Sequence, residues 1–137
     1  MTAARYLHRI GFDDIGGYLC PGMVTWRNTG KPMETLGSLS VDGFREAIAG
    51  EGVTVLDVRE EWDGGHVEGA MHVYVGHLRE RLLEVPGDRP VVAVCTSGRR
   101  SSIAASILKA EGYDVSNVQG GRNAWRSKGF PVKIAPR

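Results

Sequence analysis

The sequence predicts an α/β domain over residues 40–137, built on a central parallel sheet with helices on both faces. Short apolar runs rich in β-branched residues occur at 53–58 and 90–94, as expected for strands that are buried on both sides. Segments with helical spacing of apolar residues separate these runs, and such alternation is typical of parallel sheets. The chain of 137 residues is long enough for one domain with a substantial core.

The first half of this domain contains three predicted elements. The segment SVDGFREAIAG (40–50) predicts a helix, because Ser40 suits the N-cap position. The run VTVLDV (53–58) predicts a buried strand that ends directly before Arg59. The segment GHLRERLLEV (76–85) predicts a second helix, since its three leucines have helical spacing and a Pro-Gly pair follows.

The second half contains four more predicted elements. The run PVVAV (90–94) predicts a strand, and SSIAASILKAEG (101–112) predicts a helix with Ser101 as its N-cap and a glycine at its C-terminal end. The run VSNVQ (115–119) predicts a third strand. The segment GRNAWRSKG (121–129) predicts a last short helix, which a glycine and a nearby proline terminate.

Residues 1–39 lie outside this alternation and contain an internal repeat. The stretch 3–32 resembles 104–131 at small, apolar, glycine, tryptophan and proline positions. The matched pairs are Ala3–Ala4 with Ala104–Ala105, Leu7 with Leu108, Gly11–Phe12–Asp13 with Gly112–Tyr113–Asp114, Gly22 with Gly121, Trp26 with Trp125, Gly30 with Gly129, and Pro32 with Pro131. Because about 35 residues cannot bury a core alone, we expect residues 1–39 to be the C-terminal tail of a preceding module, with 31–39 as the linker.

The stretch CTSGRRS (95–101), here called the cysteine loop, is the main candidate site. It lies between a predicted strand and a predicted helix, where backbone N–H groups converge and the helix end carries partial positive charge. Two arginines add full positive charge, so the thiolate form of Cys95 should be favoured. We expect Cys95 to be a nucleophile. The expected anion-binding residues are Thr96, Ser97, Gly98, Arg99, Arg100 and Ser101.

Composition and charge exclude several classes of function. The net charge is +1 without a basic run, which argues against nucleic acid as a partner. No apolar stretch approaches the length that spans a bilayer, and the N-terminus lacks a signal-peptide core, so we expect no membrane partner and a cytoplasmic location. In a reducing compartment Cys20 and Cys95 should stay unbridged. The histidines and cysteines lack metal-ligand spacing, so we expect no metal.

Three stretches together resemble the rhodanese-like sulfurtransferases. They are VLDVREEWDGGHVEGAMHV (55–73), VAVCTSGRRSSIAA (92–105) and the closing Gly-Gly-x-x-x-Trp segment in 118–132. The resemblance covers about 40–132 as a full domain and 3–32 as the tail of a second one. The sequence CTSGRRSSIAAS is most similar to that of rhodanese modules fused behind metallo-β-lactamase-like domains, including persulfide dioxygenase fusions. This implies an upstream metallo-β-lactamase-like or rhodanese domain as a partner.

The resemblance implies a rhodanese fold and a two-step sulfur transfer without metal or organic cofactor. The implied donors are thiosulfate, glutathione persulfide or another low-molecular-weight persulfide, and the implied acceptors are cyanide and thiols. Cys95 would carry the sulfur as a persulfide. Asp57 and Arg59 would pair beside the cysteine loop and support it, Arg100 would bind the donor anion, and Arg99 would point outward.

Two alternatives to a sulfurtransferase stay open. A cysteine-based phosphatase or arsenate reductase of related fold needs an arginine six positions after the cysteine, whereas here Arg100 stands at five and Ser101 at six. The shorter loop should suit a sulfur atom better than a tetrahedral phosphate. A persulfide carrier or regulatory module without turnover would share the first half-reaction. His66 is expected to be a turn residue and not a general base.

Overall fold

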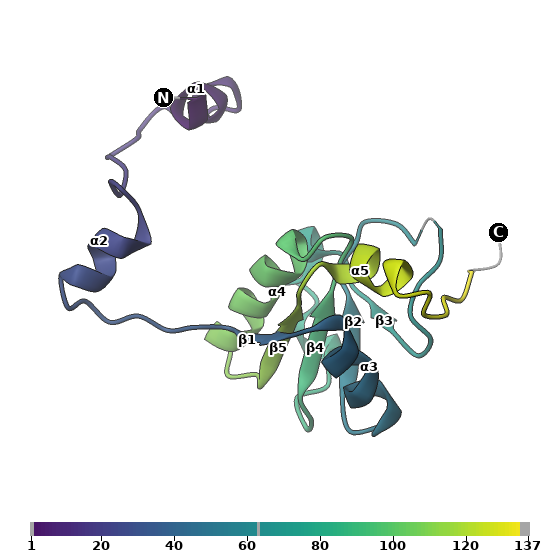
Figure 1. Ribbon diagram of the computed structural model, residues 1–137. Coiled ribbons are helices and arrows are strands. Elements are labelled where there is room, and N and C mark those ends of the chain that lie inside the picture. The colour runs from purple at the N-terminus through teal and green to yellow at the C-terminus, as the bar shows by residue number, and fades with distance from the viewer. Residues whose placement is uncertain (1, 63, 135–137) are drawn as a thin grey trace. The chain divides into compact units, whose positions relative to one another are not determined.

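The structure is a computed structural model that describes residues 2–62 and 64–134. The chain divides into two compact units, residues 1–34 (unit 1) and residues 35–137 (unit 2). Unit 2 contains the cysteine loop and is built around the sheet seen in Figure 1.

The described part of unit 2 forms a five-stranded parallel sheet in the order β1-β5-β4-β2-β3. The strands are β1 (Gly37–Leu39), β2 (Thr54–Asp57), β3 (Met71–His72), β4 (Val91–Val94) and β5 (Val115–Val118). The three predicted strands are confirmed as β2, β4 and β5. The two outer strands escaped prediction, because β1 lacks β-branched residues and β3 has only two residues.

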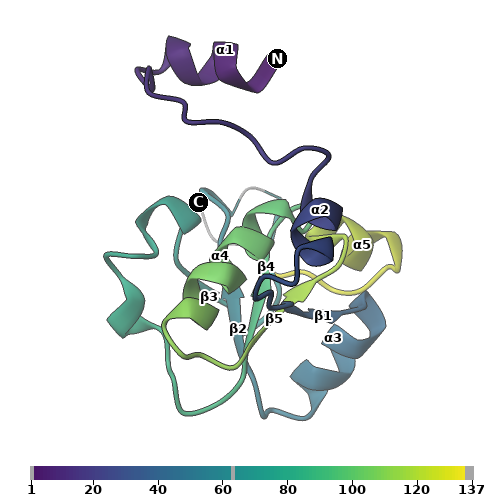
Figure 2. The ribbon, with the colours of Figure 1, turned by 90° about the vertical axis from the view of Figure 1, so that its left-hand side faces the viewer.

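Helices cover both faces of the sheet, which confirms the predicted architecture. The helix α4 (Arg99–Ala110) packs on one face, and α3 (Val41–Ala49) and α5 (Gly121–Ser127) pack on the other, as Figure 2 shows. Each face has its own apolar cluster: one joins Leu56 and Leu108, and the other joins Val55 with the aromatic rings of α3 and α5. Alternate residues of β2 thus point to opposite faces, as strand geometry requires.

The predicted helix at 76–85 is wrong. The segment contains two short 3₁₀ turns, η1 (Val75–His77) and η2 (Leu82–Glu84). Its leucine spacing was misleading, because Leu78 is fully buried while Leu83 is fully exposed. The hydroxyl of Tyr113 donates to the carbonyl of Leu82 at 3.0 Å, which fixes this turn against the end of α4.

One of the two predicted N-caps is confirmed. Ser40 caps α3, since its hydroxyl accepts the N–H of Gly43 at 3.1 Å. Ser101 is not the cap of α4, because that helix starts two residues earlier and is preceded by Gly98 in the left-handed conformation. Ser101 therefore lies in the first turn of the helix, which leaves its hydroxyl available for the thiol of the cysteine loop.

Unit 1 contains α1 (Thr2–Arg9) and α2 (Met23–Asn28), joined by irregular backbone. The expected linker 31–39 does not hold at its end, since Gly37–Leu39 form strand β1 and pair with β5 in the sheet of unit 2. Within the described residues, no helix is long and apolar enough to cross a membrane.

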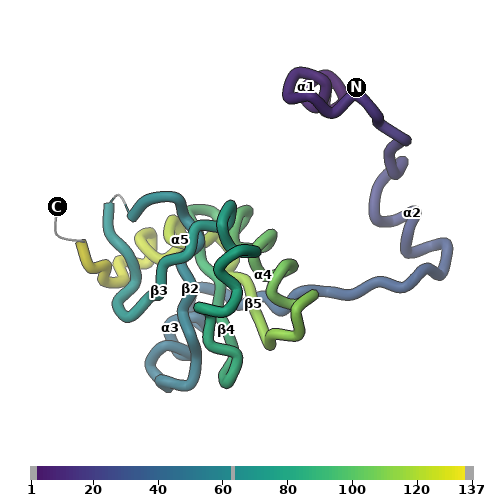
Figure 3. Tube along the Cα trace, turned by 180° about the vertical axis from the view of Figure 1, so that it is seen from behind, coloured from purple at the N-terminus to yellow at the C-terminus, as the bar shows by residue number. Residues whose placement is uncertain are grey.

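The chain between β2 and β3 crosses the end of the sheet and meets the C-terminal segment. His66 and Lys133 form an isolated antiparallel bridge with N···O distances of 2.8 Å in both directions. Figure 3 shows these two segments side by side. The bridge ties the segment before β3 to the C-terminal segment.

Candidate active site

The sheet and α4 together place Cys95. The residue follows the last residue of β4 and is 1% exposed. The chain then turns through Gly98, whose φ of 96° lies in the left-handed region that favours glycine. A Cβ at this position would lie 3.2 Å from the carbonyl oxygen of Val118, so the turn packs tightly against β5. The helix α4 starts directly afterwards, as the sequence pattern predicted for a strand-loop-helix site.

Two donors point at the sulfur of Cys95. The N–H of Gly98 donates to Sγ at 3.2 Å, and the hydroxyl of the fully buried Ser101 donates to Sγ at 3.3 Å. Burial is the largest single effect and raises the pKa of the Cys95 thiol. Hydrogen bonds from the Ser101 hydroxyl and from the N–H groups of Ser101, Ser97 and Gly98 together outweigh it, so the pKa lies below the ordinary value of 9.0.

The start of α5 holds the cysteine loop from the other side, a role that the sequence analysis missed. The N–H of Arg122 donates to the carbonyl of Cys95 at 2.7 Å, and the N–H of Asn123 donates to that of Thr96 at 3.0 Å. Gly121 makes this contact possible, because a Cβ there would overlap the Cys95 carbonyl oxygen. The Gly-Gly pair of VQGGRNAW is the sequence signal for this contact, because a pair of glycines permits close approach of two backbone segments.

Asp57 and Arg59 form a buried ion pair, as the resemblance implied. The Arg59 guanidinium donates to the Asp57 carboxylate at 2.7 Å and 2.9 Å, and both side chains are almost fully buried. The guanidinium also donates to the carbonyl of Gly65 at 2.9 Å, and Arg122 donates to the same carbonyl at 3.0 Å. His72 contacts the carbonyl of Arg59 at 2.7 Å through Nε2. The pair thus holds the backbone at Gly65 against Arg59 and Arg122.

A pocket of about 290 Å³ opens over the cysteine loop. It is lined by Arg59, Glu60, Glu61, Thr96, Arg100 and Arg122. The half-buried Arg100 donates from Nη2 to the Thr96 hydroxyl at 3.0 Å, which holds its guanidinium over the loop. Arg99 is exposed and does not line the pocket. Arginine and glutamate side chains give this pocket charges of both signs, so the pocket is suited to small charged molecules.

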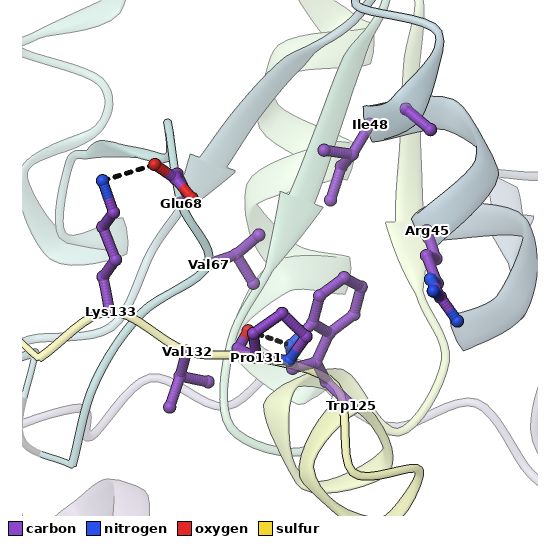
Figure 4. A pocket seen from close by; sticks show the side chains of 9 residues that line it. Arg45, Ile48, Val67, Glu68, Trp125, Pro131, Val132 and Lys133 are labelled. Atoms are coloured by element: carbon purple, nitrogen blue, oxygen red, sulfur yellow. Dashed lines mark hydrogen bonds and ion pairs between the residues drawn. The ribbon is translucent and has the colours of Figure 1, made fainter.

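A second cavity of about 280 Å³ lies on the α3 and α5 face and contains no residue of the cysteine loop. Figure 4 shows its apolar floor of Trp125, Ile48 and Val67, with an ion pair between Lys133 and Glu68 at its rim. The indole N–H of Trp125 donates to the carbonyl of Pro131 at 2.8 Å. No residue of the cysteine loop lines this cavity, so the pocket over Thr96 and Arg100 is the candidate site next to Cys95.

His66 packs against Trp62. The ring of His66 stacks on that of Trp62 with a centroid distance of 3.7 Å, and burial lowers the pKa of this histidine. The expected turn role does not hold for His66 itself, because this residue is paired with Lys133 in a backbone bridge and the turns lie at Gly64 and at 68–69. Cys20 and Cys95 are both free thiols. Among residues 2–62 and 64–134 no three His, Cys, Asp or Glu side chains gather into a group that could hold a metal ion.

Several known proteins are similar to this chain. The chain is 31% identical to the thiosulfate sulfurtransferase GlpE of Actinobacillus pleuropneumoniae over 105 residues, covering 74% of this chain and 97% of that protein. It is 33% identical to the putative sulfur carrier protein YrkF of Bacillus subtilis over 66% of this chain, but spans only 51% of that relative. It is 38% identical to the HTH-type transcriptional regulator Rv0324 of Mycobacterium tuberculosis, of which it spans 41%. None of these three is named as a metallo-β-lactamase fusion.

Solved structures agree with the fold. A rhodanese-related protein from Thermoplasma volcanium superposes with a TM-score of 0.68 at 29% identity, over 72% of this chain and 99% of that one. An NAD-dependent persulfide reductase from A. fulgidus superposes with a TM-score of 0.55 at 31% identity, over 75% of this chain and 17% of that one. The family described as the rhodanese-like domain matches residues 40–128. With this match over most of the chain and the same parallel sheet, the chain belongs to the rhodanese-like domain family.

Proposed function

We propose that this protein is a sulfurtransferase that carries sulfane sulfur on Cys95. The observation that carries the proposal is the sulfur of Cys95 itself, which accepts hydrogen bonds from Gly98 and Ser101 and has a lowered thiol pKa. A thiolate is the nucleophile in thiol chemistry, and a lowered pKa raises its population at neutral pH. The similarity to GlpE thiosulfate sulfurtransferases supports the same chemistry.

In the first half-reaction the Cys95 thiolate attacks the sulfane sulfur of thiosulfate. A bond forms between Sγ and that sulfur, the sulfur–sulfur bond of thiosulfate breaks, and its electron pair leaves with sulfite. The product is an anionic Cys95 persulfide. The N–H groups of Ser97, Gly98 and Ser101 form hydrogen bonds that lower the pKa of the thiol, and donors of the same loop would stabilise the negative charge of the persulfide. Arg100 would hold the departing sulfite by charge-assisted hydrogen bonds.

In the second half-reaction a nucleophile takes the outer sulfur from Cys95. Cyanide gives thiocyanate, and a thiolate gives a new persulfide, while the Cys95 thiolate is regenerated in both cases. The sequence CTSGRRSSIAAS of the cysteine loop and α4 resembles that of rhodanese modules in persulfide dioxygenase fusions. On that resemblance we propose glutathione persulfide or a similar low-molecular-weight persulfide as a second donor, and a metallo-β-lactamase-like or rhodanese domain as a working partner.

A second candidate function is sulfur carriage without turnover. It is favoured by the 33% identity to the putative sulfur carrier protein YrkF. A carrier would form the same Cys95 persulfide but would release it only to a protein thiol.

Steady-state assays separate these functions. The protein is incubated with thiosulfate and cyanide, thiocyanate is measured, and glutathione then replaces cyanide as the acceptor. Repeated turnover that Cys95→Ser abolishes and Cys20→Ser preserves supports the enzyme. Persulfide formation without turnover on any small acceptor favours the carrier. Hydrolysis of an aryl phosphate without any persulfide would overturn the proposal in favour of a phosphatase, for which the loop is one residue short.

A further inference from the structure

Unit 1 reproduces the local backbone geometry of the repeat partner in unit 2. After α1 the N–H of Phe12 donates to the carbonyl of Leu7 at 3.0 Å. After α4 the N–H of Tyr113 donates to the carbonyl of Leu108 at 3.1 Å. The intervening glycines of the two copies have the same φ of 88°. The helix end is therefore the same structure in both copies.

The second helix of each copy is closed in the same way. The indole N–H of Trp26 donates to the carbonyl of Pro32 at 2.9 Å. The indole N–H of Trp125 donates to the carbonyl of Pro131 at 2.8 Å. This contact joins residues six positions apart at matched places in the repeat. The sequence repeat therefore extends to a specific side-chain contact.

The two copies differ in what covers them. Leu108 is fully buried and Trp125 is 4% exposed, whereas Leu7 is 38% exposed and α2 has no buried residue. Unit 1 exposes a set of large apolar side chains that is unusual for 34 residues. They are Tyr6, Leu7, Ile10, Phe12, Ile15, Tyr18, Leu19, Met23, Val24 and Met33.

Unit 2 shows what such a copy needs to bury its apolar side. Its α4 packs on strands β4 and β5, and its β5 lies between β1 and β4. The ring of Trp125 contacts that of Phe44 in α3 with a centroid distance of 5.3 Å, and Figure 4 shows it beside Ile48 of the same helix. All of these covering elements come from residues 35–103, the front part of the fold. Among the described residues of unit 1 there is no strand and no counterpart of this front part.

We propose that unit 1 is the closing part of a second rhodanese-like fold, and that its apolar side binds the front part of such a fold, which is here called the partner. The partner would supply strands equivalent to β1 and β4 on either side of residues 13–20, and an aromatic helix equivalent to α3 against Trp26. The binding surface of the partner would thus be a parallel sheet that lacks one strand between its equivalents of β1 and β4.

A second copy of this chain does not fit as the partner. In unit 2 the position between β1 and β4 is already filled by β5, with Ser38 paired to Ser116 and Val91 to Val115. Binding of unit 1 there would have to displace the copy's own closing segment. The partner therefore carries a front part without its own closing segment.

The experiment supplies that front part to the intact chain. Residues 35–103 are placed a second time directly before Ala3, which matches Ala104 in the repeat, and the added copy carries Cys95→Ser. Hydrogen exchange is then followed in residues 7–19 and, as the internal reference, in β4 of unit 2. We expect protection of residues 7–19 to rise by about a hundredfold or more over the native chain, because a cooperative unit forms.

Two matched variants test the apolar side within the extended chain. Leu7→Glu introduces a charge at the place of the buried Leu108 and should abolish the gain. Arg5→Glu changes an exposed residue whose counterpart Ser106 is also exposed, and should keep it. The proposal would be overturned if β4 stays protected from hydrogen exchange while residues 7–19 exchange as fast as in the native chain. Equal protection of residues 7–19 in the Leu7→Glu and Arg5→Glu variants would overturn it as well. Neither readout depends on sulfur transfer.

Discussion

The two cysteines of this chain have opposite surroundings. Cys20 is exposed in the irregular backbone before α2. Its backbone carbonyl accepts a hydrogen bond from the Thr25 hydroxyl at 3.0 Å. Cys95 is almost fully buried, yet two donors point at its sulfur and its thiol pKa is lowered. Hydrogen bonds to the sulfur, and not exposure, are what make Cys95 the candidate nucleophile. What matters is a rigid backbone that directs hydrogen-bond donors at the sulfur.

The rigidity around Cys95 comes from three parts of unit 2. Cys95 directly follows strand β4, and the first turn of α4 supplies hydrogen-bond donors to its sulfur. The first residues of α5 donate a hydrogen bond to the carbonyl of Cys95. The segment around Cys20 has no such frame within the described residues of unit 1. Single substitutions can remove the contacts around Cys95 one at a time, and each has a control substitution that should leave the Cys95 site unchanged.

The largest effect is expected from Asp57→Asn, which leaves the buried Arg59 guanidinium without its carboxylate. Losing one partner of a buried ion pair costs on the order of 3–5 kcal/mol. The control Asp42→Asn removes an exposed pair with Lys128 and should cost less than about 1 kcal/mol. Urea unfolding followed by circular dichroism measures both losses. Similar losses in the two variants would show that the buried pair does not frame the site.

A smaller but still large effect is expected from Gly121→Ala. The new Cβ would overlap the Cys95 carbonyl oxygen, so the variant should lose about 3 kcal/mol of unfolding free energy and most of its sulfur-transfer rate. The control Gly112→Ala has a φ of 88° with nothing within 4 Å of the new Cβ. It should lose only the left-handed backbone penalty of about 1 kcal/mol and keep its rate. Equal rate losses would contradict a contact-based role for Gly121.

Ser101→Ala tests the hydroxyl donor to Cys95. Because the wild-type pKa lies below 9.0 partly through this bond, its loss should raise the pKa and move the thiolate titration to higher pH. At pH 7 the persulfide should form about three- to tenfold more slowly, since a hydrogen bond to a charged group is worth roughly 1.5–3 kcal/mol and higher basicity restores some nucleophilicity. Thiolate absorbance against pH in a Cys20→Ser background gives the titration.

The matched control for Ser101 is Ser102→Ala. The Ser102 hydroxyl donates to the carbonyl of Arg99 at 2.7 Å and not to the sulfur. Its titration curve should overlay that of the wild type. An unchanged curve for Ser101→Ala would show that the backbone donors suffice.

The smallest effect on stability is expected from the arginines of the cysteine loop. Arg100→Ala removes a guanidinium from the pocket and should raise KM for thiosulfate about tenfold with little change in stability, because a charge-assisted hydrogen bond is lost. Arg99→Ala should change KM by less than about twofold, since Arg99 is exposed and outside the pocket lining. Equal effects of the two substitutions would mean that the general charge, and not the position of Arg100, attracts the donor.

The sequence predicted the elements whose signal is local. Strand β4, an apolar run, and the N-cap at Ser40 depend on nearby residues, and both are confirmed. The predicted helix at 76–85 failed because tertiary contacts decide that segment: Leu78 is buried while Leu83 points into solvent, and Tyr113 binds its carbonyls. Strand β3 has no pattern of its own and forms only because β2 lies beside it.

The candidate site divides in the same way. Cys95, Gly98 and Arg100 could be predicted, because the order strand, cysteine, glycine and helix lies within one short stretch. The contribution of Arg122 and Gly121 could not, because they reach the Cys95 carbonyl from a helix 26 or more residues later in the chain. Ser101 was assigned to the loop, but its contact with the sulfur depended on where α4 begins.

The most direct test of the Cys95 account is the intact mass of the protein after incubation with thiosulfate and removal of the excess. The account predicts a gain of one sulfur atom on the wild type and on Cys20→Ser, no gain on Cys95→Ser, and loss of the added sulfur when cyanide follows. A sulfur atom that is retained in Cys95→Ser and lost in Cys20→Ser would contradict it, because the framed cysteine would then not be the one that reacts.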